Sequence, residues 1–184
     1  MKRWMSYTAL LVGLLSIGLT TPLGEAAEVS KDRTVRLILA TIKAFRTLYV
    51  EHILLQINKA GVQPKEDWSK DDHAIMLPFQ FVKLAGVQIK RESKNLEVGL
   101  VSLTPIYASN FPKTPAEVEA LKTMMADPTQ TVLTFTDRDQ FKGLAADVAI
   151  QQVCADCHNH HPDSPKRDFK KGDLMGAIVV RLRN

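Results

Sequence analysis

The chain has 184 residues, of which 45% are hydrophobic, with 24 Lys and Arg against 20 Asp and Glu. This length is sufficient for one domain with its own hydrophobic core. The formal net charge of +4 gives no reason to expect a nucleic acid or an anionic membrane surface as the partner.

The N-terminus has the pattern of a secretory signal peptide. Lys2 and Arg3 precede an apolar run over residues 7–19, and small residues follow up to Ala27. We therefore predict a signal peptide over residues 1–26 and a mature domain over 27–184, located in the periplasm or otherwise outside the cytoplasm. The run is short for a membrane span, so a retained anchor is the less favoured alternative. No second run of spanning length follows, and we expect a soluble mature protein without stable membrane insertion.

Residues 31–60 predict one long amphipathic helix that ends near Gly61. One face of this helix carries residues at alternating spacings of four and three, namely Ile38, Ile42, Phe45, Tyr49, His52 and Gln56. Because His52 shares a largely apolar stripe, we expect its imidazole to point into the core.

The remaining elements predict an α+β domain with an antiparallel sheet, a long N-terminal helix and flanking helices. Pro78 suits the first turn of a helix within residues 73–93, and Thr114 with Glu117 forms a capping box before a helix that ends near Ala126. Alternating or β-branched residues predict strands over 96–103, 131–136, 143–150 and 174–182. A turn or short helix from about Gln151 separates the last two strands.

Cys154, Cys157 and His158 form a CxxCH sequence, the attachment motif of c-type haem, and the chain has no other cysteine. One helical turn separates the thiols, so both can reach the vinyl groups of one porphyrin, and the next residue places an imidazole under the iron. A short-loop disulfide and a zinc site, with His160 and His161 as further ligands, are the alternatives. A thioredoxin-like pair is disfavoured because no clear βαβ pattern surrounds the cysteines. We predict one covalently bound haem c.

The C-terminal forty residues resemble the family of PAS-like c-type haem domains of unknown function. This family includes a cyanobacterial photosystem-associated protein and extracytoplasmic domains of bacterial chemoreceptors and histidine kinases. The segments that carry the resemblance are 145–149, 154–159, 161–169 and 172–176, with looser agreement at 102–105 and 110–112. The resemblance implies a PAS-like fold. It also implies a cysteine from the N-terminal helical region as second axial ligand, which this chain lacks.

His158 is the predicted proximal ligand of the haem iron, and His52 is the candidate for the distal position. A buried imidazole needs a polar partner, and iron would provide one. The alternative for His52 is a core histidine that forms a hydrogen bond with the backbone. His73 and Met175 are the next candidates for the distal position.

Three further residues are candidates for contacts with the haem. Tyr49 lies one turn before His52 and could line the pocket, although core packing is the favoured alternative. Lys166 and Arg167 are close enough in sequence to the motif to pair with propionates, with a solvated turn as the alternative.

These features predict an exported monohaem cytochrome that exchanges electrons with a redox partner protein. The alternative is a haem-based redox or gas-sensing domain that works with a separate signalling partner. We do not expect an enzyme, because no clear acid–base pair accompanies the haem motif. Ligation of the iron discriminates the two functions, since two strong protein ligands favour electron transfer and an open position favours ligand binding.

Overall fold

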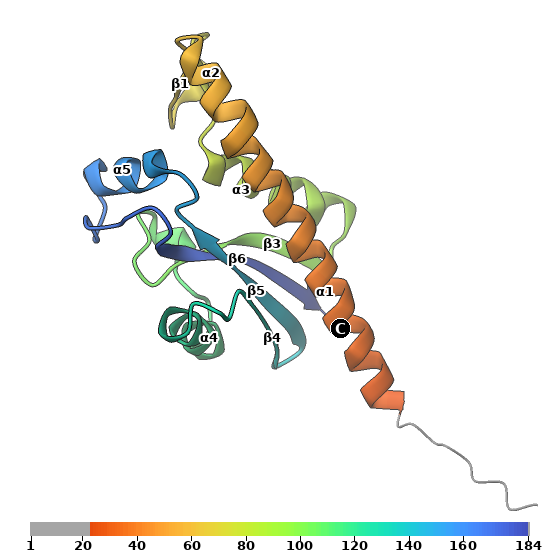
Figure 1. Cartoon of the computed structure of the whole chain (residues 1–184). Helices are drawn as coiled ribbons and strands as arrows, with labels where there is room; N and C mark the ends of the chain where they lie inside the picture. The colour runs from red at the N-terminus through yellow and green to blue at the C-terminus, as the bar shows by residue number, and fades with distance from the viewer. Residues whose placement is uncertain (1–22, 184) are drawn as a thin grey trace, which may run out of the picture.

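The computed structural model describes residues 23–183 (Figure 1). The predicted signal peptide lies for the most part outside these residues, so its cleavage stays a prediction. Within residues 23–183, no helix combines the length and the apolar character that crossing a bilayer requires.

A continuous helical rod forms the N-terminal part of the described chain, as the sequence predicts. It consists of α1 (Leu23–Leu48), the π-helical segment η1 (Tyr49–Leu54) and α2 (Leu55–Lys59). Gly61 follows with a φ of 85°, a left-handed conformation that glycine adopts without a steric penalty and that ends helices efficiently.

Four antiparallel strands form the main sheet in the order β3, β6, β5, β4. Their bounds are β3 (Leu96–Val101), β4 (Val132–Asp137), β5 (Gln140–Val148) and β6 (Leu174–Arg183). The other elements are α3 (Pro78–Glu92), α4 (Pro115–Ala126), α5 (Gln152–His160), the 3₁₀ turns η2 (Trp68–Lys70) and η3 (Ala108–Asn110), and a short parallel pair, β1 (Gln63–Pro64) with β2 (Ala74–Ile75). The predicted α+β class is therefore confirmed.

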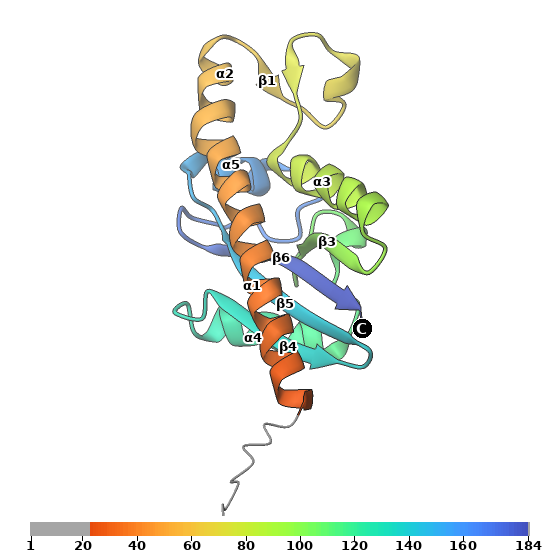
Figure 2. The same ribbon diagram turned by 90° about the vertical axis from the view of Figure 1, so that its right-hand side faces the viewer.

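Helices cover both faces of the sheet (Figures 1 and 2). Val35 and Leu39 of α1 pack on the face that carries Ile178 and Val180. Residues of α4 pack on the opposite face, and the side chains there are Leu121, Met124, Leu144, Ala177 and Val179. This alternation along β6 is the period of two that a strand imposes, and it makes β6 a central strand buried on both sides.

The helix α3 lies directly against β3, and Gly86 permits this close approach. A Cβ atom at position 86 would lie 2.2 Å from the carbonyl oxygen of Val98. Backbone cannot yield cheaply, so the helix would have to move away from the strand.

We therefore expect Gly86→Ala to lower the free energy of unfolding by about 1–3 kcal/mol, the usual effect of overpacking. Alanine favours a helix over glycine by about 1 kcal/mol, so helix propensity alone would make the variant more stable. A net loss of stability would therefore be due to the steric conflict. Gly99→Ala in β3 is the matched control, because its nearest neighbour would be a side-chain atom at 3.8 Å. Urea unfolding of both variants checks this, and equal stabilities would contradict the packing argument.

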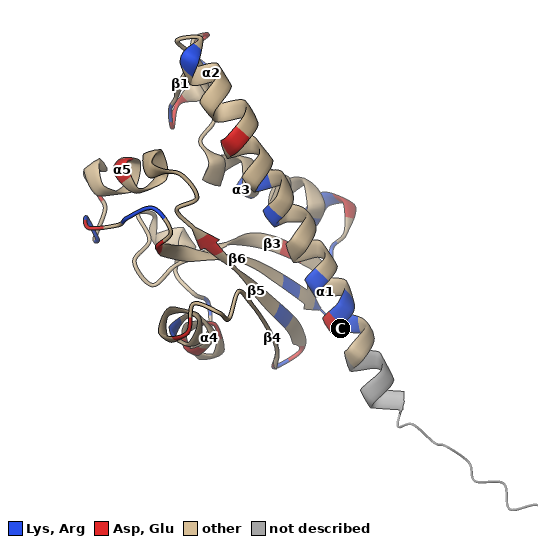
Figure 3. Cartoon of the chain, in the orientation of Figure 1, with Lys and Arg blue, Asp and Glu red and all other residues tan. Residues whose placement is uncertain are grey.

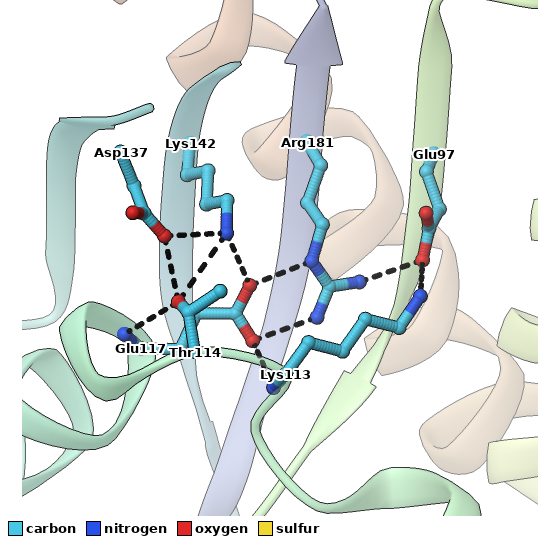
Figure 4. A network of polar contacts seen from close by, with 7 residues as sticks. All are labelled: Glu97, Lys113, Thr114, Glu117, Asp137, Lys142 and Arg181. Carbon is cyan, nitrogen blue, oxygen red and sulfur yellow. Dashed lines mark hydrogen bonds and ion pairs between the residues drawn. The ribbon is translucent and has the colours of Figure 1, made fainter. Parts of the chain in front are cut away.

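A network of polar side chains with a buried centre lies between α4 and the sheet (Figure 4). Its members are Glu97, Lys113, Thr114, Glu117, Asp137, Lys142 and Arg181. Arg181 donates to both carboxylate oxygens of Glu117, at 2.7 and 2.8 Å, and Lys142 donates to the same carboxylate at 2.9 Å.

The Lys and Arg positions within β5 and β6 lie at the end of the sheet away from α5 (Figure 3).

Glu117 has a larger role than the capping box predicts. Its backbone N–H donates to the Thr114 hydroxyl, as expected for the cap. Its carboxylate, however, accepts a hydrogen bond from the backbone N–H of Lys113 at 2.8 Å. The same carboxylate also accepts hydrogen bonds from the buried side chains of Lys142 and Arg181. The side chain is fully buried, so the first turn of α4 is connected to the sheet by ion pairs as well as by apolar packing.

Candidate functional site

A mainly apolar cleft lies where one end of the sheet meets α3 and α5. It contains about 1130 Å³ of empty space, part of it open to solvent. The lining residues come from the helical rod, β1 and the segment after it, the start of α3, β3 and the loop after it, the end of β5, α5 and β6. The lining residues that carry reactive or charged groups are Arg46, Glu66, Tyr107, Asp147, Cys154, Cys157, His158, His161 and Met175.

The helix α5 presents the CxxCH sequence to this cleft. Cys154, Cys157 and His158 all line it. Both cysteines are free, with Cys154 half-buried and Cys157 exposed. Because positions three and four apart share one helical face, the helix orients the two thiols and the imidazole towards the same space. The short helix predicted after Gln151 is thus confirmed, and it groups the predicted attachment residues at one cleft.

The imidazole of His158 is held in a largely apolar setting. The ring of Phe169 meets it edge-on, with 5.8 Å between the ring centroids. Asn159 fixes Phe169 by donating to its carbonyl oxygen at 2.8 Å and accepting from its N–H at 2.9 Å. Burial, and then the nearby His161 and Arg46, lower the pKa of His158 to about 4. At neutral pH this imidazole is therefore uncharged, the form that binds a metal.

An ion pair between Arg46 and Asp147 forms part of the cleft wall. Arg46 of α1 lies 2.8 Å from Asp147 of β5, and their side chains are only 10% and 17% exposed. The register of β5 against β6 shifts at Asp147 and Val148, a bulge that changes the direction of this strand end. Burial raises the pKa of Asp147, and Arg46 opposes this rise.

Glu66, Tyr107 and His161 form a polar cluster that joins three separate segments at the cleft. The hydroxyl of Tyr107 donates to the Glu66 carboxylate, and His161 Nε2 lies 2.9 Å from the same oxygen. The N–H of Asp163 donates to Nδ1 of His161. Nδ1 is therefore the acceptor, and Nε2 carries the proton that His161 donates to Glu66. The hydrogen bonds from Tyr107 and His161 lower the pKa of Glu66.

The prediction that His52 faces the core is wrong. His52 is exposed and does not line the cleft, and Phe45 on the predicted stripe is 55% exposed. The buried face instead follows Val35, Leu39, Arg46, Tyr49, Val50 and Leu54. Apolar residues on both faces of α1 obscured the boundary between them, and η1, with more residues per turn, shifts the phase at His52 itself. The cleft geometry thus gives no support to His52 as distal ligand.

Of the alternative distal candidates, His73 is exposed and lies away from the cleft lining. Met175 does line the cleft, where it is buried and packs with Ala149, Ala155 and Phe169. His161 also lines it, but both of its ring nitrogens are engaged in hydrogen bonds. Met175 is therefore the one distal candidate from the sequence that the cleft retains.

Tyr49, Lys166 and Arg167 do not line the cleft. Tyr49 packs in the core, where its ring stacks on Phe81 and its hydroxyl donates to the Met76 carbonyl at 2.6 Å. Burial raises its pKa to about 12. Lys166 pairs with Asp168, and Arg167 donates to the Pro162 carbonyl at 2.6 Å, so both cations are engaged within the loop after α5.

Arg46, the cation at the cleft, was not predicted from the sequence. A signal was present, because Arg46 follows Ile42 by four residues and precedes Tyr49 by three, which places it on the buried face. Asp147 carried a weaker signal, as a charge next to a run of small apolar residues. The zinc alternative finds no ligand set, since residues with described side chains contain no group of three or more His, Cys, Asp or Glu suited to a metal ion.

Fold and cleft define an α+β domain that presents two thiols and one imidazole from a single helix to an apolar cleft. The chain belongs to the Tll0287-like family, whose model matches residues 25–183. The crystal structure of the cyanobacterial haem protein Tll0287 is similar, with 17% identity, a TM-score of 0.52 and coverage of 89% of this chain and 96% of that chain. At this identity the likeness shows a common fold. No curated protein matches this chain.

Proposed function

We propose that this chain is an exported haem protein that holds one haem c through Cys154 and Cys157, with His158 as proximal ligand. We propose further that it transfers electrons to or from a redox partner protein, and that it is not an enzyme. The observation that carries the proposal is the common orientation of both thiols and the imidazole towards one cleft. The similarity to a solved haem protein supports it.

The residues at the cleft fit the chemistry of such a group. Free thiols can form thioether bonds with vinyl groups, and the uncharged imidazole of His158 has a nitrogen lone pair for iron. Phe169, which Asn159 fixes, restricts the rotation of the imidazole. The mainly apolar lining of the cleft offers a porphyrin ring an apolar surface to pack against. A bound haem c would supply one-electron chemistry, and the protein would supply its orientation and electrostatic environment.

The remaining parts of the proposal concern fold type and location. The antiparallel sheet with helices on both faces is compatible with a PAS-like domain. Export is proposed from the N-terminal pattern of Lys2, Arg3 and residues 7–19, followed by cleavage near Ala27. The formal net charge of +4 gives no reason to propose a nucleic acid as the partner.

Expression in a host that attaches haem c during export tests the proposal. We expect mature protein that begins near Ala27 and carries one haem that resists extraction with acidified acetone. Mass spectrometry and the absorption spectrum of the denatured protein would measure both. A matured protein that releases its haem would contradict covalent attachment, and retention of residues 1–26 would contradict cleavage.

A second function, haem-based sensing with a separate signalling partner, is favoured by one observation. Both ring nitrogens of His161 are engaged in hydrogen bonds, so Met175 is the single candidate from the sequence that remains at the cleft as a second protein ligand. A thioether is a weaker ligand than an imidazole, so a bound haem would be more accessible to an exogenous ligand than one held by two histidines. Carbon monoxide distinguishes the two functions. A ferrous protein that binds it rapidly would favour sensing, and one that excludes it would favour electron transfer.

A further inference from the structure

The Arg46–Asp147 ion pair stands in an unusual place for charged residues. Both side chains line the mainly apolar cleft that also contains Cys154, Cys157 and His158. Both are largely buried, and the two charged groups are 2.8 Å apart. The pair connects α1 to the end of β5 at the point where that strand bulges.

Stability alone gives a poor explanation for this pair. Desolvation of two charges offsets most of their attraction, and well-packed apolar residues of similar size are often as stable or more stable. The opposite end of the same sheet already carries the network around Glu117 (Figure 4). A separate reason for charges at the cleft is therefore needed.

Electrostatics at the proposed iron site provides that reason. Arg46 is the only Lys or Arg among the described residues that line the cleft, and it shares that lining with Cys154, Cys157 and His158. Guanidinium keeps its charge at all accessible pH values. In a cleft of low dielectric, charges act over longer distances than they do in water.

We propose that Arg46 and Asp147 together set the reduction potential of the haem, with Asp147 balancing the positive charge of Arg46. This inference rests on the proposed function. Oxidised iron carries one more positive charge than reduced iron, so a nearby cation favours the reduced state and raises the potential, and a nearby anion lowers it. As a neutral pair, the two residues hold the reduction potential between the higher value that Arg46 alone would give and the lower value that Asp147 alone would give. Asp147 also fixes the guanidinium of Arg46 in position.

The test is a charge cycle measured by redox titration of the haem-loaded protein. Asp147→Asn leaves Arg46 without its counter-charge, and we expect a higher midpoint potential. Addition of Arg46→Gln to Asp147→Asn removes the cation, and we expect the potential to return towards the wild-type value. Glu119→Gln, at an exposed position of α4, is the control and should leave the potential unchanged.

A second variant keeps the proposal open to refutation if Asp147→Asn does not fold. Arg46→Met retains much of the side-chain volume and leaves Asp147 unpaired, so the potential should fall in alkaline buffer, where the carboxyl is ionised. A folded Asp147→Asn or Arg46→Met variant whose potential equals that of the wild type would overturn the inference, as would a double variant that keeps the raised potential. A wild-type protein without covalent haem would instead overturn the proposed function, and the inference with it.

Discussion

Replacement of both Cys154 and Cys157 by alanine is expected to abolish covalent haem in the exported protein. Each thiol forms one of the two thioether bonds in the proposed attachment, and both thiols line the same cleft. Each single variant should carry less covalent haem than the wild type, because it loses one of the two thioether bonds. Some covalent haem should remain, because the other thiol can still form its bond. Haem-stained denaturing gels and mass spectrometry of the matured protein would measure the loss.

Asp156→Asn is the matched control for the cysteine variants. Asp156 lies between the two cysteines on α5, but its side chain is exposed and accepts a hydrogen bond from Gln152 at 2.8 Å. We expect full covalent haem in this variant. Covalent haem in the double alanine variant would show that attachment occurs elsewhere, and would remove the principal support for the proposed function.

The sequence predicted the order and type of the principal elements because each depends on a local pattern. Pro78 begins α3, alternation identifies β3, and Thr114 caps α4. The attachment residues were equally accessible, since CxxCH places its chemistry within one helical turn. The antiparallel character of the sheet was predicted, but the strand order β3, β6, β5, β4 was not, because pairing depends on contacts between distant segments.

The walls of the cleft were much harder to predict. They depend on which face of the helical rod is buried. Rotation of the rod about its axis by a fraction of a turn would bury His52 in place of Arg46. Exposed apolar residues such as Leu37 and Phe45 made the outer face resemble a core face. The cluster of Glu66, Tyr107 and His161 joins segments up to 95 residues apart, and no local pattern reports such a contact.

The network around Glu117 should make the stability of the protein strongly dependent on acid pH. Arg181 and Lys142, together with the backbone of Lys113, lower the pKa of Glu117 to about 2, although burial alone would raise it. The usual pKa is 4.5, so the stabilisation is fully present above about pH 4.5 and is lost as the pH falls towards 2. Integrated over that window, the loss amounts to about 3 kcal/mol, a large part of the stability of a typical domain.

Glu117→Gln is therefore expected to lower the free energy of unfolding at pH 7 by about 3–5 kcal/mol, because it leaves Arg181 and Lys142 buried without the carboxylate between them. The variant should also lose part of the decline in stability between pH 4.5 and pH 2. Glu119→Gln is the control, since Glu119 lies two residues further along α4 with its side chain 70% exposed. Urea unfolding of the three proteins across this pH range would test both effects. A Glu117→Gln variant as stable as the control at pH 7 would mean that α4 is held to the sheet by Leu121 and Met124 alone, with the charges contributing only geometry.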